Sequence, residues 1–142
     1  MNTNTRFSVA VHILTLLAMS PAEPLSSEAI AGSVNTNPVV VRRILGALGK
    51  AGLTQSQLGA GGGALLARQA GAINLRDVYR AVDDGELFTL PARTPNPRCA
   101  CGRHILPIIS GVFDEAASAA ERVLAATTIA QLADEIRQRA AA

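Results

Sequence analysis

The sequence predicts a mainly α-helical protein with one small β-hairpin. Hydrophobic residues fill 49 % of its 142 positions, but there are only three Phe, one Tyr and no Trp. Such an alanine- and leucine-rich core suits helices that approach each other closely through small side chains. Apolar residues recur at helical spacing over most of the chain, and a glycine-rich stretch interrupts them near the middle. The length fits one domain with an added helix for association.

The first helix is expected from about Thr5 to Met19, where apolar residues recur every three or four positions. Pro21 prevents its continuation. This apolar run mimics a secretory signal, but His12 interrupts it and Glu23 follows it, so we interpret it as an internal helix. We expect His12 to be a hydrogen-bonded core residue rather than a metal ligand.

Two short helices follow, separated by a tight turn. Ser26 is expected to cap the first, which ends near Val34. Asn37 is expected to cap the second, with Pro38 at the first helical position, where its missing N–H costs nothing. Gly52 is placed to end that helix after Ala51. Two short helices joined so closely form a helix-turn-helix.

A β-hairpin is predicted directly after this pair. Residues 53–58 are strand-like, residues 59–63 form a glycine-rich turn, and residues 64–67 return as the partner strand. A hairpin in this position is a wing, so the predicted fold is a winged helix-turn-helix. Asn74 should then cap a fourth helix over residues 75–82.

The remaining chain is expected to serve association. Residues 83–103 should form a loop because three prolines stand within seven residues, and residues 104–142 should hold a long dimerisation helix, from about His104 to Ala126, and a short terminal helix. The long helix repeats apolar residues at alternating four- and three-residue spacing, as a coiled-coil seam does. We expect a two-fold dimer through it, with burial inside one chain as the alternative. The predicted interface residues are Ile105, Ile109, Val112, Phe113, Ala116, Ala119 and Val123.

The helix-turn-helix indicates double-stranded DNA as a partner, because the second helix of such a pair enters the major groove. Spacing places Val41, Ile44, Leu45 and Leu48 on the core face of that helix and its two arginines on the other. A guanidinium pairs bidentately with guanine or holds a phosphate, and two solvated surface charges are the alternative. Residues 1–80 carry seven basic and three acidic side chains, which also suits a DNA-facing part.

Other candidate DNA contacts surround this helix. Two valines at its start suit thymine methyl groups, the preceding helix begins with serines that either cap it or receive a phosphate, and the wing glycines allow close approach to DNA. The predicted DNA-binding residues are Ser26, Ser27, Asn37, Val39, Val40, Arg42, Arg43, Ser56, Gln57, Gly59, Gly61 and Gly62.

These motifs resemble those of one family. Ser27–Ala31, Asn37–Leu45, Leu48–Leu53, Ser56–Gly63 and Ile73–Val82 resemble the Rrf-type (IscR/NsrR/CymR) bacterial winged helix-turn-helix regulators, and residues 9–14 and 96–99 look closest to the YwnA-like branch. The resemblance implies a dimeric transcription factor with the long helix as its interface. The wing departs from the family pattern, with Leu58 where the family usually carries Arg and Ala64 where it carries an aromatic residue.

Cys99 and Cys101 leave the effector open. Family members that sense through iron–sulfur clusters carry three cysteines in this loop, whereas this chain has two. With His104 they offer at most three ligands for a cluster or metal ion. The other interpretations are a redox-sensing thiol, which nearby arginines would favour, or inert cysteines. We expect no cofactor.

The sequence therefore predicts a cytoplasmic homodimer that binds a pseudo-palindromic operator and represses transcription. No Ser-His-acid set, paired-carboxylate motif or phosphate loop indicates an enzyme, and no apolar run approaches the ~18 residues that a bilayer span needs. The alternative is a dimeric interaction module of the same fold with lost or weak DNA binding, which Leu58 and Ala64 motivate.

Overall fold

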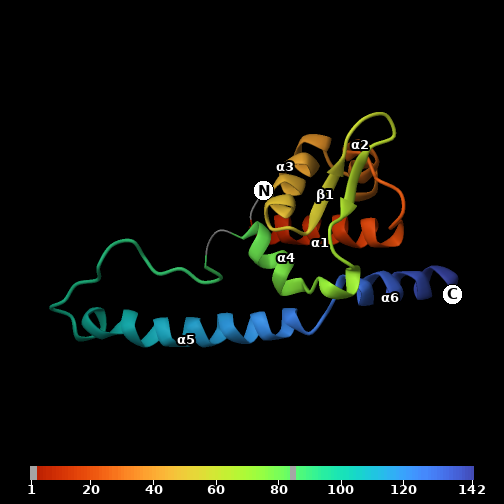
Figure 1. The fold of residues 1–142 in the computed structure, drawn as a ribbon. Coiled ribbons are helices and arrows are strands. Elements are labelled where there is room, and N and C mark those ends of the chain that lie inside the picture. The colour runs from red at the N-terminus through yellow and green to blue at the C-terminus, as the bar shows by residue number, and fades with distance from the viewer. Residues whose placement is uncertain (1–2, 84–85) are drawn as a thin grey trace. The chain divides into compact units, whose positions relative to one another are not determined.

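A computed structural model describes residues 3–83 and 86–142, and its elements are drawn in Figure 1. It is mainly helical, and one antiparallel sheet of two strands lies in the part of the chain described. The described residues divide into two compact units, residues 3–83 with 124–142, and residues 86–123. In chain order the elements are α1 (Thr3–Met19), α2 (Ser27–Val34), α3 (Pro38–Lys50), β1 (Thr54–Gln57), β2 (Gly63–Leu66), the short 3-10 helix η1 (Ala70–Ala72), α4 (Leu75–Val82), α5 (Ala100–Ala125) and α6 (Ile129–Ala141).

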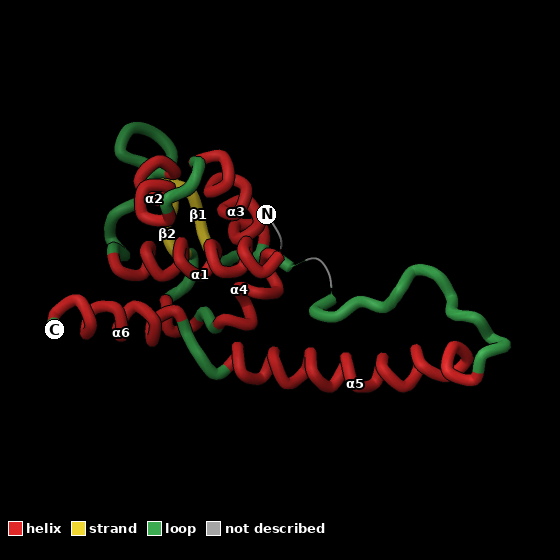
Figure 2. The backbone as a smooth tube through the Cα atoms, turned by 180° about the vertical axis from the view of Figure 1, so that it is seen from behind, coloured by secondary structure: helices red, strands yellow, loops and turns green. Residues whose placement is uncertain are grey.

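Helix α1 is the centre of the first unit. It packs against α2, α3, α4 and α6, and Figure 2 shows it between the helix-turn-helix pair and α6. Ile13, Leu14 and Leu17 are buried, as the helical spacing predicts. The core is completed from the surrounding elements by Ile30, Val41, Ile44, Leu48, Leu53, Ile73, Val78, Val82, Ile129 and Ala133.

The helix-turn-helix is built by the predicted capping residues. The Ser26 side chain accepts a hydrogen bond from the Ala29 amide at 3.1 Å, and the Asn37 Oδ1 accepts one from the Val39 amide at 2.8 Å. Between the helices, Asn35 ends α2 in the left-handed conformation with φ 63°, which asparagine tolerates better than most residues. Each cap bonds to an amide no more than three residues away in the sequence, so the helix-turn-helix could be predicted from the sequence.

Strands β1 and β2 form the wing, paired from Thr54 opposite Leu66 to Gln57 opposite Gly63. Strand β1 is shorter than predicted, since Leu53 lies in the core and its amide donates to the Leu48 carbonyl at the end of α3. Strand β2 has the predicted length but begins one residue earlier than predicted, at Gly63. Two backbone hydrogen bonds, of 3.0 and 2.8 Å, join Leu25 to Ala64 and tie the wing to the segment that precedes α2.

Helix α6 belongs to the first unit, so the expectation that it groups with the long helix is wrong. Ile129 and Ala133 are buried in the core that α1 centres. The Leu75 amide donates to the Thr127 carbonyl, and the Ile129 amide donates to the Ile73 carbonyl. These bonds hold the start of α6 beside the start of α4. The predicted caps of α4 and α6, Asn74 and Thr128, both form capping boxes.

Helix α5 begins at Ala100, four residues before the predicted start, so the expected loop end at residue 103 is also wrong. Asn96 organises this start: its side chain accepts from the Arg98 amide at 3.0 Å and its carbonyl accepts from the Cys99 amide at 3.2 Å. Pro107 lies inside the helix, where it removes one backbone hydrogen bond. Of the three prolines, Pro91 and Pro95 precede Asn96, and Pro97 lies in the turn that starts the helix, so the loop is shorter than expected.

None of the α5 residues is buried within the single chain. Ile105, Val112 and Val123 of the predicted interface are 38, 59 and 71 % exposed, and Ile109, Phe113, Ala116 and Ala119 are half-buried. Phe113 stacks on Phe88 of the preceding loop with ring centroids 5.1 Å apart. Over the described ranges, none of the helices has both the length and the hydropathy to cross a bilayer.

Candidate DNA-binding surface

Helix α3 presents two chemically different faces, as predicted. Val41, Ile44 and Leu48 are buried, while Arg42 and Arg43 are exposed to solvent. Because a helix turns by 100° per residue, the positions between the buried ones fall on the outer face. The two guanidiniums are therefore available to a ligand that approaches α3 from outside.

The two valines at the start of α3 differ in exposure. Val39 is 52 % exposed, whereas Val40 is half-buried and packs against the core. The expectation that both face outward is therefore wrong for Val40, which lies on the flank of α3 beside the buried Val41. Of the two, Val39 is the valine whose side chain is exposed at the outer surface.

One carboxylate reaches the outer face of α3, and the sequence reasoning missed it. Arg42 Nη2 lies 2.6 Å from Glu28 Oε1, with 54 and 65 % of the two side chains exposed. Among the residues described, no carboxylate pairs with Arg43. Glu28 lies in the first turn of α2, but no local pattern relates positions 14 apart on two different helices. Only the packing of α2 against α3 brings this pair together.

A cleft of about 400 Å³ lies between α3 and the wing. Ser27 and Arg42 line it from the helices, and Gln55 and Ser56 line it from β1. A Cβ on Gly46, also in its wall, would meet no atom within 4 Å. The cleft therefore brings predicted DNA-binding residues from α2, α3 and the wing to one opening. Ser26 and Asn37 do not line the cleft, and their side chains are engaged as helix caps.

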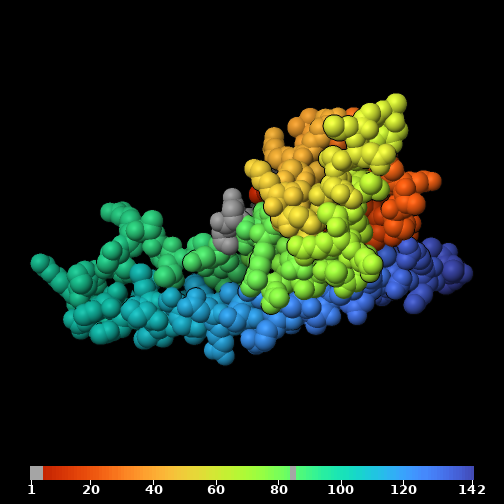
Figure 3. Space-filling model, viewed as in Figure 1, coloured from red at the N-terminus to blue at the C-terminus, as the bar shows by residue number. Residues whose placement is uncertain are grey.

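The tip of the wing projects from the first unit (Figure 3). Ser56, Gln57, Gly59 and Gly61 are exposed, as a DNA-contacting tip requires. Gly62 differs, because a Cβ there would lie 2.1 Å from the Gln57 carbonyl oxygen. The turn therefore requires glycine at position 62. Leu58 is 91 % exposed, so this residue contributes surface and no packing.

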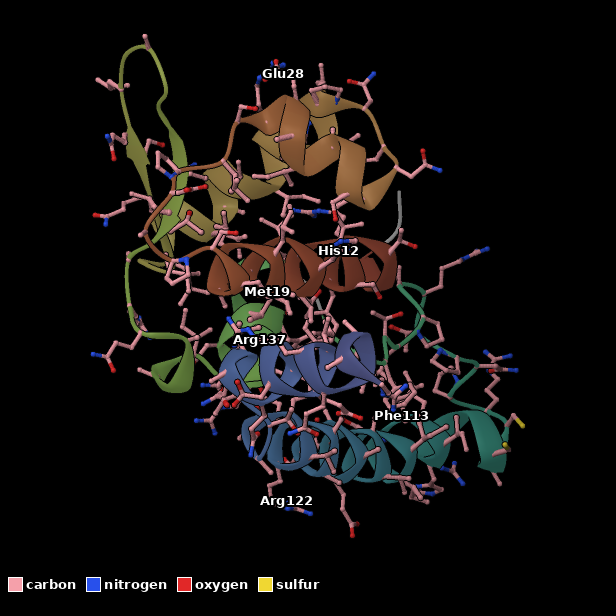
Figure 4. The ribbon with its side chains drawn as sticks, turned by 90° about the vertical axis from the view of Figure 1, so that its right-hand side faces the viewer. His12, Met19, Glu28, Phe113, Arg122 and Arg137 are labelled. Carbon is pink, nitrogen blue, oxygen red and sulfur yellow. The ribbon has the colours of Figure 1, made fainter. Side chains whose placement is uncertain are left out.

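His12 is not a core residue, and that expectation is wrong. It is exposed, and its Nε2 lies 2.9 Å from Ser33 Oγ of α2, in line with the predicted hydrogen bonding. Figure 4 shows His12 on α1 beneath α2. His12 lines a groove between α1 and α6, together with Leu16 and Leu132, and this position explains the exposure.

Comparison with known proteins identifies the family. A profile of the Rrf2 family, described as iron-dependent transcriptional regulators, matches residues 3–135. The chain belongs to the Rrf2 family. It is 42 % identical over 126 residues to YwnA of Bacillus subtilis, named as an HTH-type transcriptional regulator, with 89 % of this chain and 92 % of YwnA covered.

Solved structures agree with this membership. A crystal structure described as that of a DNA-binding protein is 39 % identical, covers 89 % of this chain and 97 % of its own, and has a TM-score of 0.72. A transcriptional regulator from Lactobacillus plantarum is 26 % identical over 93 % of this chain and 89 % of its own, with a TM-score of 0.77. The winged helix-turn-helix fold is thereby confirmed, and the chain is a transcription regulator of this family, not an enzyme.

The cysteines of this chain do not fit an iron or cluster site within the single chain. Cys99 and Cys101 are both free and exposed. Across residues 3–83 and 86–142, no three His, Cys, Asp or Glu side chains gather as metal ligands, so the predicted trio with His104 does not converge. The His104 Nε2 instead accepts a hydrogen bond from Arg103 Nε at 3.3 Å. The described residues therefore offer fewer ligands for iron than the description of the family as iron-dependent suggests.

Proposed function

We propose that this chain is a homodimeric repressor that reads a pseudo-palindromic operator with α3. The observation that carries the proposal is the pair Arg42 and Arg43, exposed on α3 opposite its buried face. In a winged helix-turn-helix protein this helix enters the major groove. Family membership supports DNA as the partner. Binding to the bacterial chromosome would place the protein in the cytoplasm.

Each part of the surface has an assigned role in this proposal. Arg42 and Arg43 contact guanine edges or phosphates, and Val39 contacts a thymine methyl group. Ser27 and Ser56 border the cleft beside α3, where a backbone phosphate would approach. The glycines at the wing tip let the hairpin come close to the DNA backbone.

We assign the dimer interface to α5. A helix of 26 residues without a buried side chain leaves its apolar seam for a partner. Two copies joined there would present two α3 helices to half-sites about one helical turn, or ~34 Å, apart. Cys99 and Cys101, exposed beside the start of α5, are the candidates for a redox response of this dimer.

The test is DNA binding by Arg42→Ala, Arg43→Ala and the double variant. Each single change should weaken operator binding by about 1–3 kcal/mol if the side chain reads a base. A lost phosphate contact should instead weaken all sequences alike and lower the salt slope by about 1. Arg139→Ala is the matched control, because it removes an exposed charge from α6 in the same unit.

Two results would count against the proposal. An unchanged affinity of the double variant would show that α3 does not read DNA. A wild-type protein that is not retained on any duplex at low salt would favour the interaction module of the same fold.

A further inference from the structure

The Glu28–Arg42 pair joins the two helices of the helix-turn-helix at their outer surface. Figure 4 shows Glu28 on the outer side of α2, pointing away from α1. The Arg42 Nη2 donates to Glu28 Oε1 at 2.6 Å, and more than half of each side chain is exposed. A solvent-exposed pair of this kind adds little to folding stability. Its geometry therefore calls for an explanation other than stability.

The carboxylate engages one end of the guanidinium and leaves the rest of it free. Arginine carries five N–H donors in a rigid fork, so contact through Nη2 still leaves donors for a base edge. A side chain held in this way loses less rotamer entropy when it docks. Arg43, for which the described chain offers no carboxylate partner, must be ordered by the DNA itself.

The same carboxylate also weakens contacts that carry no sequence information. A negative charge on the outer face of the helix-turn-helix is repelled by the phosphates of any duplex. A guanidinium already paired with Glu28 gains less from a phosphate than a free one does. Selectivity is a difference between affinities, and penalising the wrong partner increases it.

Resting on the proposed function, we propose that Glu28 is a positioning residue that sets the sequence selectivity of α3. It orients the Arg42 guanidinium towards a base edge and lowers the affinity for DNA without the matching base pair. Arg42 is then the selective reader of the pair, and Arg43 is the less selective contact.

The test compares Glu28→Ala, Glu28→Asp and a control, Glu23→Ala. Aspartate keeps the charge but shortens the reach by one methylene, so it separates position from charge. Glu23 is an exposed acid in the segment between α1 and α2, and its removal changes the net charge equally. The operator is first obtained by selecting wild-type binders from a random duplex library. Dissociation constants are then measured for the operator, single-base-pair variants and a scrambled duplex.

The expected result is a loss of discrimination at one base pair. Glu28→Ala should tighten binding to the scrambled duplex and reduce the preference for the operator by about fivefold or more, as the loss of one bidentate base contact would. Glu28→Asp should reduce that preference without tightening scrambled DNA. Glu23→Ala should leave the preference unchanged, and in an Arg42→Ala background Glu28→Ala should no longer change it.

Two different failures can be told apart. If Glu28→Ala tightens operator and scrambled duplex equally and Glu28→Asp has no effect, the carboxylate acts only by repulsion and the inference is overturned. If the wild-type protein itself has no sequence preference, the proposed function is overturned, and the inference falls with it.

Discussion

The wing is joined to the rest of its unit at Gly63 and Ala64, and a single methyl group should disrupt this joint. A Cβ added to Gly63 would lie 2.3 Å from the Leu25 carbonyl oxygen and 2.4 Å from its carbon, both rigid backbone atoms. Real contacts of this kind stay above 3.0 Å. Gly63→Ala must therefore push the wing away from Leu25 and break the two hydrogen bonds, of 3.0 and 2.8 Å, between Leu25 and Ala64.

The cost can be worked from these contacts. Two backbone hydrogen bonds contribute about 0.5–1.5 kcal/mol each, and the positive φ of 155° adds about 1 kcal/mol for a residue with a side chain. The free energy of unfolding should thus fall by about 2–4 kcal/mol. Gly61→Ala is the matched control, because its φ is 75° but no atom lies within 4 Å of its Cβ. It should cost only about 1 kcal/mol.

Urea unfolding followed by helical circular dichroism measures both variants, at one protein concentration because association shifts apparent stability. Hydrogen exchange supplies the second readout. The amides of Leu25 and Ala64 should lose protection in Gly63→Ala and keep it in Gly61→Ala. Equal destabilisation of the two variants, within about 0.5 kcal/mol, would refute the argued clash.

Two further predictions concern the helices. Asn74→Ala removes the cap of α4, because the Asn74 side chain accepts a hydrogen bond from the Asp77 amide at 2.9 Å. The free energy of unfolding, measured in urea, should fall by about 1 kcal/mol, and an unchanged unfolding midpoint would contradict the capping role. Val112→Glu places a charge on the exposed apolar seam of α5 and should shift the protein towards monomer in sedimentation velocity, while Ser118→Glu off the seam should not. Dimers that tolerate Val112→Glu would exclude this seam as the interface.

The sequence could predict features whose causes are local. Ser26, Asn37 and Asn74 were predicted as caps because a cap bonds to an amide two or three residues away. The two faces of α3 follow from helical periodicity alone. The predicted dimer seam rests on the same periodicity, and no contact in a single chain tests it.

The features that were missed depend on tertiary contacts. The Glu28–Arg42 pair requires α2 and α3 to pack together. The early start of α5 requires Asn96 to bond across a turn, with Gly102 close enough that a Cβ would lie 2.4 Å from the Asn96 oxygen. Proline content suggested a longer loop because it does not reveal that Pro97 lies in the turn at the start of the helix. Neither the composition of the sequence nor the spacing of its residues reports these distances between residues that folding brings together.

Four consecutive residues, 25–28, connect the parts of the proposed DNA-binding surface. Leu25 bonds to the wing, Ser26 caps α2, Ser27 lines the cleft and Glu28 holds Arg42. The wing and α3 therefore both contact one short backbone segment. That segment is held in place by the Ser26 cap and by the core beneath α2. Precise placement of a base-reading side chain needs such rigid support, because errors near 1 Å cost much of a directional contact. This arrangement explains how a wing with an exposed leucine at residue 58 can still serve the surface, as a rigid flank for α3 and not as a base reader.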